Sequence, residues 1–134
     1  MSLGSWDPKI NSETTPFDID ITVLKRFVGY ATGEQLDQLS QLLNAQEQQR
    51  FAAYMQLDGA YWQQSVVALS SDEIEALMRF FTVAEQLAGW EAGAKSPVIP
   101  LGRMLKQRAV GINRELTLWI KAHSNNQYLP HGPL

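Results

Sequence analysis

Two histidines, His123 and His131, are the residues best suited to acid–base or metal chemistry in this chain. They lie eight positions apart with Pro130 between them, so they cannot face each other across one helical turn as metal ligands at i and i+4 do. No carboxylate follows Glu115, and the chain has no cysteine. A metal site would need acids from the earlier part of the chain, and the sequence predicts neither a metal nor a cofactor.

His123 has a simpler explanation than catalysis, because it falls at the end of a predicted helix. A cation there interacts favourably with the last carbonyl groups of the helix. The glycines form no phosphate-binding loop, and Asp72 and Glu73 stand in a first helical turn, where acids favour the positive end of the dipole. No catalytic residue is predicted, and an enzyme with a cleft around His123 is kept as the second alternative.

The C-terminal stretch WIKAHSNNQYLPHGPL, residues 119–134, carries the other polar side chains that could form a site. Pro130 and Pro133 prevent a helix there, so the end of the chain is predicted to be an extended tail. This tail either lies in a groove of its own helical bundle or is presented to another protein. The structural role is favoured: the amides and the tyrosine fix the tail to the bundle. The candidate groove site comprises Trp119, Lys121, His123, Asn125, Asn126 and Tyr128.

Charge is divided unequally along the chain. From Lys95 onward there are six cations and one acid, whereas the first 94 residues have five cations and thirteen acids, for a net charge of −3. Three explanations are open: internal pairing of the two parts, self-association of complementary surfaces, or a patch for an anion or nucleic acid. The candidate basic patch comprises Arg103, Lys106, Arg108 and Arg114.

A helix-turn-helix for nucleic-acid binding lacks several residues that the motif would need. Gly111 suits the turn between the last two helices. However, Gln107 stands where the motif usually has alanine, and Thr117 stands where the second helix should bury an aliphatic side chain. The net acidic charge also disfavours the phosphate contacts that supply most of the affinity. Nucleic acid is therefore a disfavoured partner, and an anion or nucleic-acid binder is kept as the first alternative.

The elements that would position these residues are helices. Strand signals are confined to SVVAL, which lies inside a helical period, and PVIPL, which is bracketed by prolines. The sequence predicts an all-α, single-domain, bundle-like array of about six helices. Predicted helix starts are Asp20, Thr32 with Gln35, Asn44 with Glu47, Asp58, Ser70 with Glu73, Ser96 before Pro97, and Asn113.

The segment at about residues 71–92 is predicted to be the central helix, because it has two apolar stripes. An apolar arc this wide requires burial on both flanks. If the neighbouring helices leave the second stripe uncovered, it would be an interface. The expected partner is a second copy of the chain, since two-fold dimers are the commonest oligomers. The first stripe comprises Ile74, Leu77, Phe81 and Ala84, and the second comprises Phe80, Val83, Leu87 and Trp90.

Length and composition favour one globular domain. The chain has 134 residues, 45% of them hydrophobic, and no cysteine, so it can bury a core without disulfides. Residues 1–16 are expected to form a flexible or loosely docked arm before a domain at 17–134. No apolar stretch reaches the ~18 residues of a membrane span, and the N-terminus lacks a secretion signal. A cytoplasmic location without membrane contact is expected.

Together these observations predict a small non-enzymatic helical protein that acts through protein–protein contacts. Self-association as a homodimer is the expected form of contact, and binding of another protein is the other form. The residues show no resemblance to a family of known activity.

Overall fold

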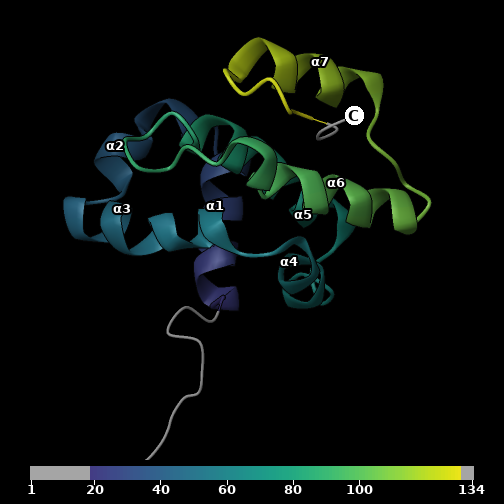
Figure 1. The fold of residues 1–134 in the computed structure, drawn as a ribbon, viewed down its shortest axis with the longest axis horizontal. Helices are drawn as coiled ribbons and strands as arrows, with labels where there is room; N and C mark the ends of the chain where they lie inside the picture. Colours follow the sequence, from purple (N-terminus) through teal and green to yellow (C-terminus); the bar gives the residue numbers. More distant parts are fainter. Residues whose placement is uncertain (1–18, 131–134) are drawn as a thin grey trace, which may run out of the picture.

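The computed structural model describes residues 19–130, in which all regular secondary structure is helical (Figure 1). The predicted all-α class is confirmed, and the predicted N-terminal arm and His131 lie outside the described residues. The seven α-helices are α1 (Ile21–Thr32), α2 (Leu39–Leu42), α3 (Ala45–Phe51), α4 (Gly59–Ser65), α5 (Ser71–Ala84), α6 (Val98–Gln107) and α7 (Arg114–His123). Three 3₁₀ segments accompany them: η1 (Leu36–Gln38), η2 (Ala52–Gln56) and η3 (Gly93–Lys95).

Four of the predicted helix starts have a side chain that caps the helix by a hydrogen bond. The Asp20 carboxylate accepts a hydrogen bond from the Thr22 amide, and the Asn113 side chain accepts one from the Leu116 amide. Asn44 and Ser70 each form a complete capping box with the glutamate three positions later. These starts are encoded locally, because a cap needs only residues within one turn.

The capping box predicted at Thr32 is wrong. Thr32 is the last residue of α1, and its hydroxyl donates to the carbonyl groups of Val28 and Gly29 in its own helix. Glu34 then adopts a positive φ of 57°, which lets the Gln35 amide donate to the Tyr30 carbonyl and close the helix end. Between Thr32 and the helix start at Asn44, the chain forms only the two short segments η1 and α2.

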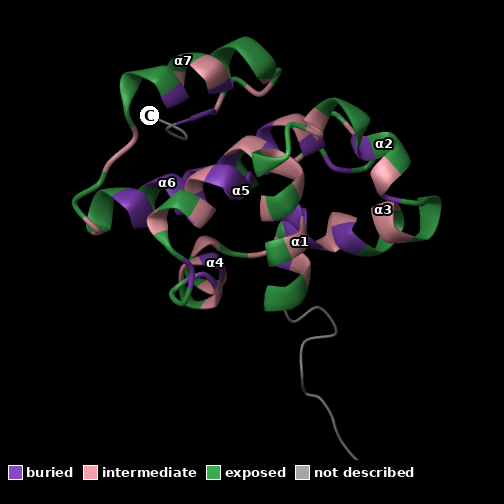
Figure 2. Cartoon of the chain, turned by 180° about the vertical axis from the view of Figure 1, so that it is seen from behind, coloured by how far each residue is buried: buried purple, intermediate pink, exposed green. Residues whose placement is uncertain are grey.

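α5 is the central helix, and its predicted burial on both flanks is confirmed. α1 and α6 make the most extensive contacts with it, and η1 and α7 add further contacts. Figure 2 shows the buried residues of the bundle gathered around α5 and α6. Eight of the 14 residues of α5 are buried: Ile74, Ala76, Leu77, Met78, Phe80, Phe81, Thr82 and Ala84.

α5 ends at Ala84, eight residues before the predicted end of the central helix. The chain turns after Glu85, and Gly89 adopts a positive φ of 86°. Trp90 then folds back into the core, where it is fully buried and its indole N–H donates to the Gln48 carbonyl at 2.9 Å. The side chain of Trp90 continues the apolar spacing of the helix because it is buried, although the backbone at Trp90 is not helical.

Aromatic rings join the helices that flank α5. Phe27 of α1 stacks on Phe80 with ring centroids 4.1 Å apart and planes 9° from parallel. Trp62 of α4 meets Phe81 edge-on at 5.2 Å. Because these rings are almost completely buried, they bind α1 and α4 to the same side-chain cluster.

α7 forms an outer layer over α5, and the chain turns back after it (Figure 1). Leu116 and Ile120 are buried on the inner face of α7, and Trp119 is half-buried. Leu129 and Pro130 are buried against the rest of the chain, so the described part of the tail lies on its own bundle. None of the described helices is long and apolar enough to cross a membrane.

Candidate functional site

The structure divides five of the six residues of the predicted groove site between two neighbouring cavities. Asn125, Asn126 and Tyr128 line a cavity of about 670 Å³ between the end of α5 and the tail. Trp119 and His123 line a second cavity of about 470 Å³, between α7 and the end of α1. Gln86 lines both cavities, and its amide donates to the His123 carbonyl. Lys121 is exposed and lines neither.

Glu85 lines the larger cavity, which we call the Glu85 cavity. Its side chain follows the last turn of α5, and the residue is only 8% exposed. One carboxylate oxygen, Oε2, accepts from the Ser96 hydroxyl at 2.6 Å. The other, Oε1, accepts from the side-chain amide of Asn126 at 2.9 Å. A single carboxylate thus joins the end of α5, the start of α6 and the tail.

Asn126 fixes the tail through every polar group that it has. Its side-chain N–H₂ donates to Glu85 and also to the Gly93 carbonyl at 2.8 Å, while its side-chain oxygen accepts from the Tyr128 amide. Its backbone N–H donates to the Ser124 hydroxyl, and its carbonyl accepts from the Leu129 amide. Asn126 therefore holds the tail against the end of α5 and η3.

Burial raises the pKa of the Glu85 carboxyl above its ordinary value, although hydrogen bonds from Ser96 and Asn126 oppose the shift. Among the described residues no cation contacts this carboxylate. Its place after the last turn of α5 adds to the cost of ionisation, because the carboxyl end of a helix carries partial negative charge. Burying an ionised carboxylate without a cation costs desolvation free energy. Groups in such an environment are candidates for functional sites.

Glu85→Gln is expected to become more stable relative to wild type as pH rises. The folded protein binds the Glu85 proton more tightly than the unfolded chain does, because burial raises the folded pKa. The stabilising contribution is therefore complete below the ordinary pKa of 4.5 and is lost as pH rises through the folded pKa. Glutamine does not titrate, so the difference in unfolding free energy should grow over that interval and then level off.

Urea denaturation at several pH values measures this difference. Glu115→Gln, a change in an exposed acid of α7, is the matched control and should show no such trend. A difference for Glu85→Gln that is constant with pH, or that shrinks as pH rises, would contradict the raised pKa.

The smaller cavity holds a stack of three side chains. The rings of Trp119 and His123 lie parallel within 20° with centroids 4.1 Å apart, and the Arg79 guanidinium lies 4.9 Å from the Trp119 ring centre. Arg79 also pairs with Glu75 at 3.2 Å. The stack orders the half-buried Trp119 on the surface of α5.

His123 shares the smaller cavity with the acids Glu34 and Asp37. Its Nδ1 atom lies 2.8 Å from the Trp119 carbonyl oxygen, so the ring is oriented by its own helix. Within residues 19–130, neither acid is hydrogen bonded to the His123 ring, and no group of three or more His, Asp or Glu residues could hold a metal ion. The cavity therefore contains an imidazole and two carboxylates, but these groups do not form the hydrogen-bonded histidine–carboxylate pair that orients a catalytic histidine.

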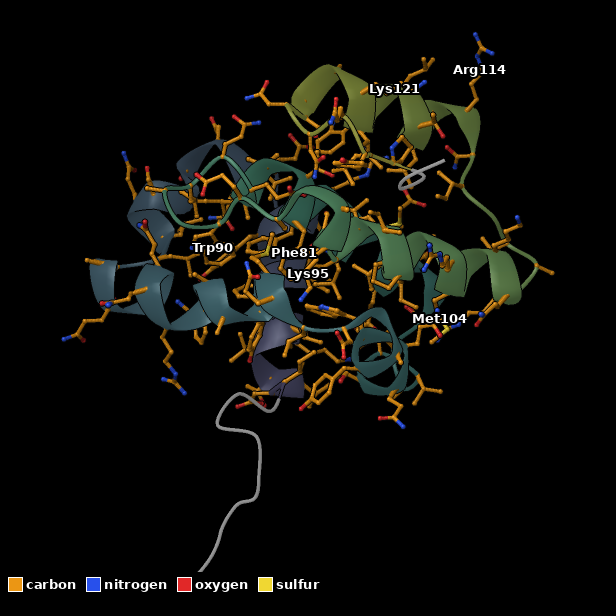
Figure 3. All side chains as sticks on the ribbon, viewed as in Figure 1. Phe81, Trp90, Lys95, Met104, Arg114 and Lys121 are labelled. Carbon is orange, nitrogen blue, oxygen red and sulfur yellow. The ribbon has the colours of Figure 1, made fainter. Side chains whose placement is uncertain are left out.

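The cations from Lys95 onward form no ion pair with any described acid. Three ion pairs occur in the described part of the chain, and all use cations before residue 80: Lys25–Glu73, Arg26–Glu47 and Arg79–Glu75. Figure 3 shows Arg114 projecting from α7 away from the rest of the molecule. Within residues 19–130, the charge asymmetry is therefore not neutralised by ion pairs between the two parts.

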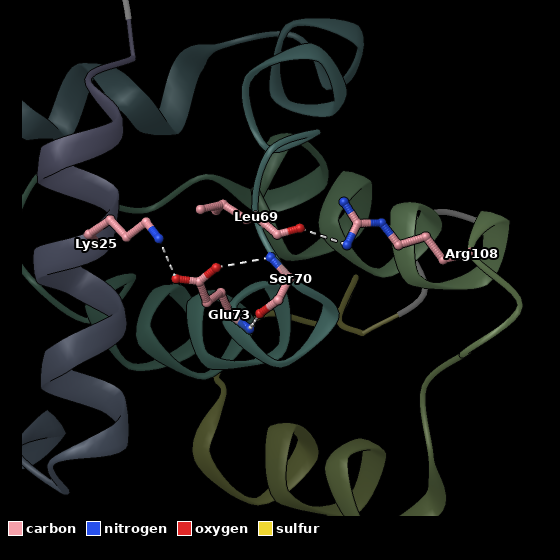
Figure 4. A network of polar contacts seen from close by, with 5 residues as sticks. All are labelled: Lys25, Leu69, Ser70, Glu73 and Arg108. Carbon is pink, nitrogen blue, oxygen red and sulfur yellow. Dashed lines mark hydrogen bonds and ion pairs between the residues drawn. The ribbon is translucent and has the colours of Figure 1, made fainter.

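Arg108 is the one member of the predicted basic patch with a structural role. Its guanidinium donates to the Leu69 carbonyl at 2.8 Å (Figure 4) and to the carbonyls of Val67 and Val66 at 3.3 and 3.4 Å. These acceptors lie in the turn between α4 and α5. Arg103 and Lys106 instead line a cavity of about 450 Å³ with an apolar side, and Arg114 is exposed.

Arg108 also brings two exposed apolar turns to the same end of the molecule. Val67 is 69% exposed in the α4–α5 turn, and Val110 is 60% exposed in the link between α6 and α7. Each has an exposed alanine beside it. Neither valine was predicted from the sequence to be a site residue. The available signal was that Val66 and Val67 are adjacent, because one face of a helix can bury only one of two adjacent residues. We call this surface the Arg108 end: Val67, Ala68, Ala109 and Val110. Two exposed charges are its neighbours in sequence, and we call them its rim: Lys106, two positions before Arg108, and Asp72, next to Ser71, whose Oγ lies 3.4 Å from the Arg108 guanidinium.

The predicted interface stripe is mostly interior. Phe80 and Trp90 are fully buried in the core, and Val83 and Leu87 are half-buried against it. A partner could reach Phe80 or Trp90 only if the core opened. The stripe is interior because α1, η1 and the 85–90 turn cover this flank of α5, for which the sequence predicted no neighbouring segment.

The chain matches no family model, no curated protein and no solved structure.

Proposed function

We propose that this protein acts through protein–protein contact and self-associates through the Arg108 end. The observation that carries the proposal is the exposure of two valines, 69% and 60%, on turns that Arg108 holds together. Apolar side chains that gather on one exposed surface favour association, because contact removes them from water. The hydrogen bonds of Arg108 reduce the freedom that the two turns would otherwise lose on binding.

The charges at the rim suit a two-fold interface. Lys106 and Asp72 are both exposed and form no ion pair with a described residue. A two-fold interface pairs the same patch with itself, so Lys106 of each copy can face Asp72 of the other. Such pairs set orientation and association rate more than affinity.

The apolar part of the Arg108 end is small, since it consists of two valines and two alanines. Stable interfaces bury about 800 Å² on each partner. The expected complex is therefore a weak dimer whose population rises with protein concentration.

Sedimentation velocity over a wide concentration range tests the proposal. Val67→Asp and Val110→Asp are each expected to abolish the dimer, whereas Leu118→Asp, at a 53% exposed leucine of α7, should leave it unchanged. Lys106→Asp and Asp72→Lys should each weaken the dimer, and the double variant should restore it. A wild-type protein that stays monomeric at the highest concentration, or equal effects of the Leu118 and valine variants, would refute the proposal.

Anion binding is the second candidate, and one cavity favours it. Arg103 and Lys106 lie on successive turns of α6 and line the same 450 Å³ space beside Ile99 and Ile112. Retention on heparin that collapses with added salt would support this function. Arg103→Gln separates the two candidates, because it should reduce heparin retention without changing self-association.

A further inference from the structure

The Glu85 cavity has the chemistry of a site for a cation. Two acids line it, Glu85 inside and the exposed Glu91, together with amide side chains and Tyr128. No lysine or arginine is among its lining residues. An anionic ligand would therefore meet a carboxylate without any compensating positive charge.

Glu85 has acceptor capacity that the described residues do not use. An ionised carboxylate can accept about four hydrogen bonds. Three neutral donors supply bonds to Glu85: the Ser96 hydroxyl, the Asn126 amide and the backbone N–H of Ala92. Neutral donors orient the carboxylate but do not neutralise it, and buried carboxylates are ordinarily paired with a cation.

The size and donor set of the cavity favour an organic cation over a metal ion. Its volume of about 670 Å³ is far larger than a bare ion needs. Within the described residues no third histidine or acid joins Glu85 and Glu91 to complete a metal site. Asn125, Gln127 and Tyr128 offer hydrogen bonds and a ring face to the body of an organic ligand.

We propose that the Glu85 cavity binds a small organic amine, whose ammonium group pairs with the Glu85 carboxylate. The carbon chain of the ligand lies against Tyr128, and Glu91 at the exposed side attracts the cation and can pair with a second ammonium group. Because Glu85 also accepts from Asn126, the ligand adds a contact to the junction that fixes the tail. This site is separate from the Arg108 end and does not depend on self-association.

The affinity of this site depends on pH in a defined direction. The ammonium pairs only with the ionised carboxylate, and burial raises the pKa of Glu85. Affinity for an amine should therefore rise as pH increases through the titration of Glu85. It should then stay constant until the amine itself loses its proton.

Titration with n-butylamine and with diaminobutane, followed by two-dimensional amide NMR, tests the proposal. Saturable shifts are expected for the side-chain amides of Asn125, Asn126 and Gln127, with affinity at least tenfold lower in Glu85→Gln. Glu115→Gln makes the same charge change on exposed α7 and should leave affinity unchanged. n-Butanol, the neutral analogue, should cause no saturable shift.

Three results would overturn the proposal: no saturable shift with either amine above the folded pKa of Glu85, equal affinity in wild type and Glu85→Gln, or equal losses in the Glu85 and Glu115 variants. The pH profile of n-butylamine binding to the wild type needs no variant to fold. A flat profile through the titration range of Glu85 would also overturn the proposal.

Discussion

Replacing Phe80 by alanine is expected to lower the free energy of unfolding by about 3–5 kcal/mol. Phe80 is fully buried, stacks on Phe27 at 4.1 Å, and meets Phe81 and Trp90 edge-on at 5.0 and 6.3 Å. Alanine would leave a cavity among rings from three segments of the chain, and close-packed neighbours fill such a space only partly. A loss of this size is comparable with the total stability of many small domains.

Chemical denaturation followed by circular dichroism measures the loss. Leu118→Ala is the control, because Leu118 is 53% exposed on α7 and its truncation should change stability by about 0.5 kcal/mol or less. A Phe80→Ala protein of nearly wild-type stability with altered self-association would contradict the burial of Phe80 and restore the interface predicted from the sequence.

The sequence predicted most helix starts because capping is local. Asn44 with Glu47 and Ser70 with Glu73 satisfy backbone donors within a single turn, whatever the rest of the chain does. Thr32 shows the limit of this reasoning. Its hydroxyl has acceptors in the preceding turn of α1, and the structure uses these instead of the cap.

The end of α5 could not be predicted, since contacts distant in sequence decide it. Trp90 continues the apolar period of the helix, yet its indole is held by the carbonyl of Gln48, 42 positions earlier. Periodicity reports which side chains are buried and does not report whether the backbone between them is helical. For the same reason the sequence could not show that the 85–90 turn covers part of the second apolar stripe.

The candidate sites were predicted in part. Asn125, Asn126 and Tyr128 were named from residue type, and all three line the Glu85 cavity. Glu85 was missed, because an acid between two apolar stripes resembles any solvated helix position. The sequence offered no signal for it, because the predicted helix ran to about residue 92 and Glu85 comes to a helix end only in the structure.

The charge asymmetry was read correctly as a feature of the chain, but the role of one cation was not. Arg103, Lys106 and Arg114 are exposed, whereas Arg108 is used for carbonyl groups of the α4–α5 turn. In the sequence these four cations had equal weight as candidates, because all of them belong to the same basic segment. Only the contacts of each side chain distinguish the four cations, and the contacts of Arg108 come from the turn between α4 and α5.

Replacing Arg108 by methionine is expected to lower the free energy of unfolding by about 2 kcal/mol, since hydrogen bonds to charged groups contribute about 1.5–3 kcal/mol. The guanidinium donates to the carbonyls of Val66, Val67 and Leu69, and Ser71 Oγ lies 3.4 Å away. Figure 4 shows its position beside the start of α5, where Ser70 and Glu73 form the cap and Lys25 of α1 pairs with Glu73. Methionine keeps much of the apolar stem but offers no donor, so the α4–α5 turn loses its attachment to the end of α6.

Urea denaturation measures this loss of stability, and two further variants serve as a control and as a conservative substitution. Arg103→Met removes an exposed arginine of the same helix and should change stability by about 0.5 kcal/mol or less. Arg108→Lys should recover only part of the loss, because one ammonium cannot reproduce the planar fork that reaches three carbonyls. Arg103→Met is also expected to reduce heparin retention. If Arg108→Met were as stable as wild type and lost heparin retention to the same extent, Arg108 would belong to an anion-binding patch. Its hydrogen bonds would then not support the Arg108 end as an interface.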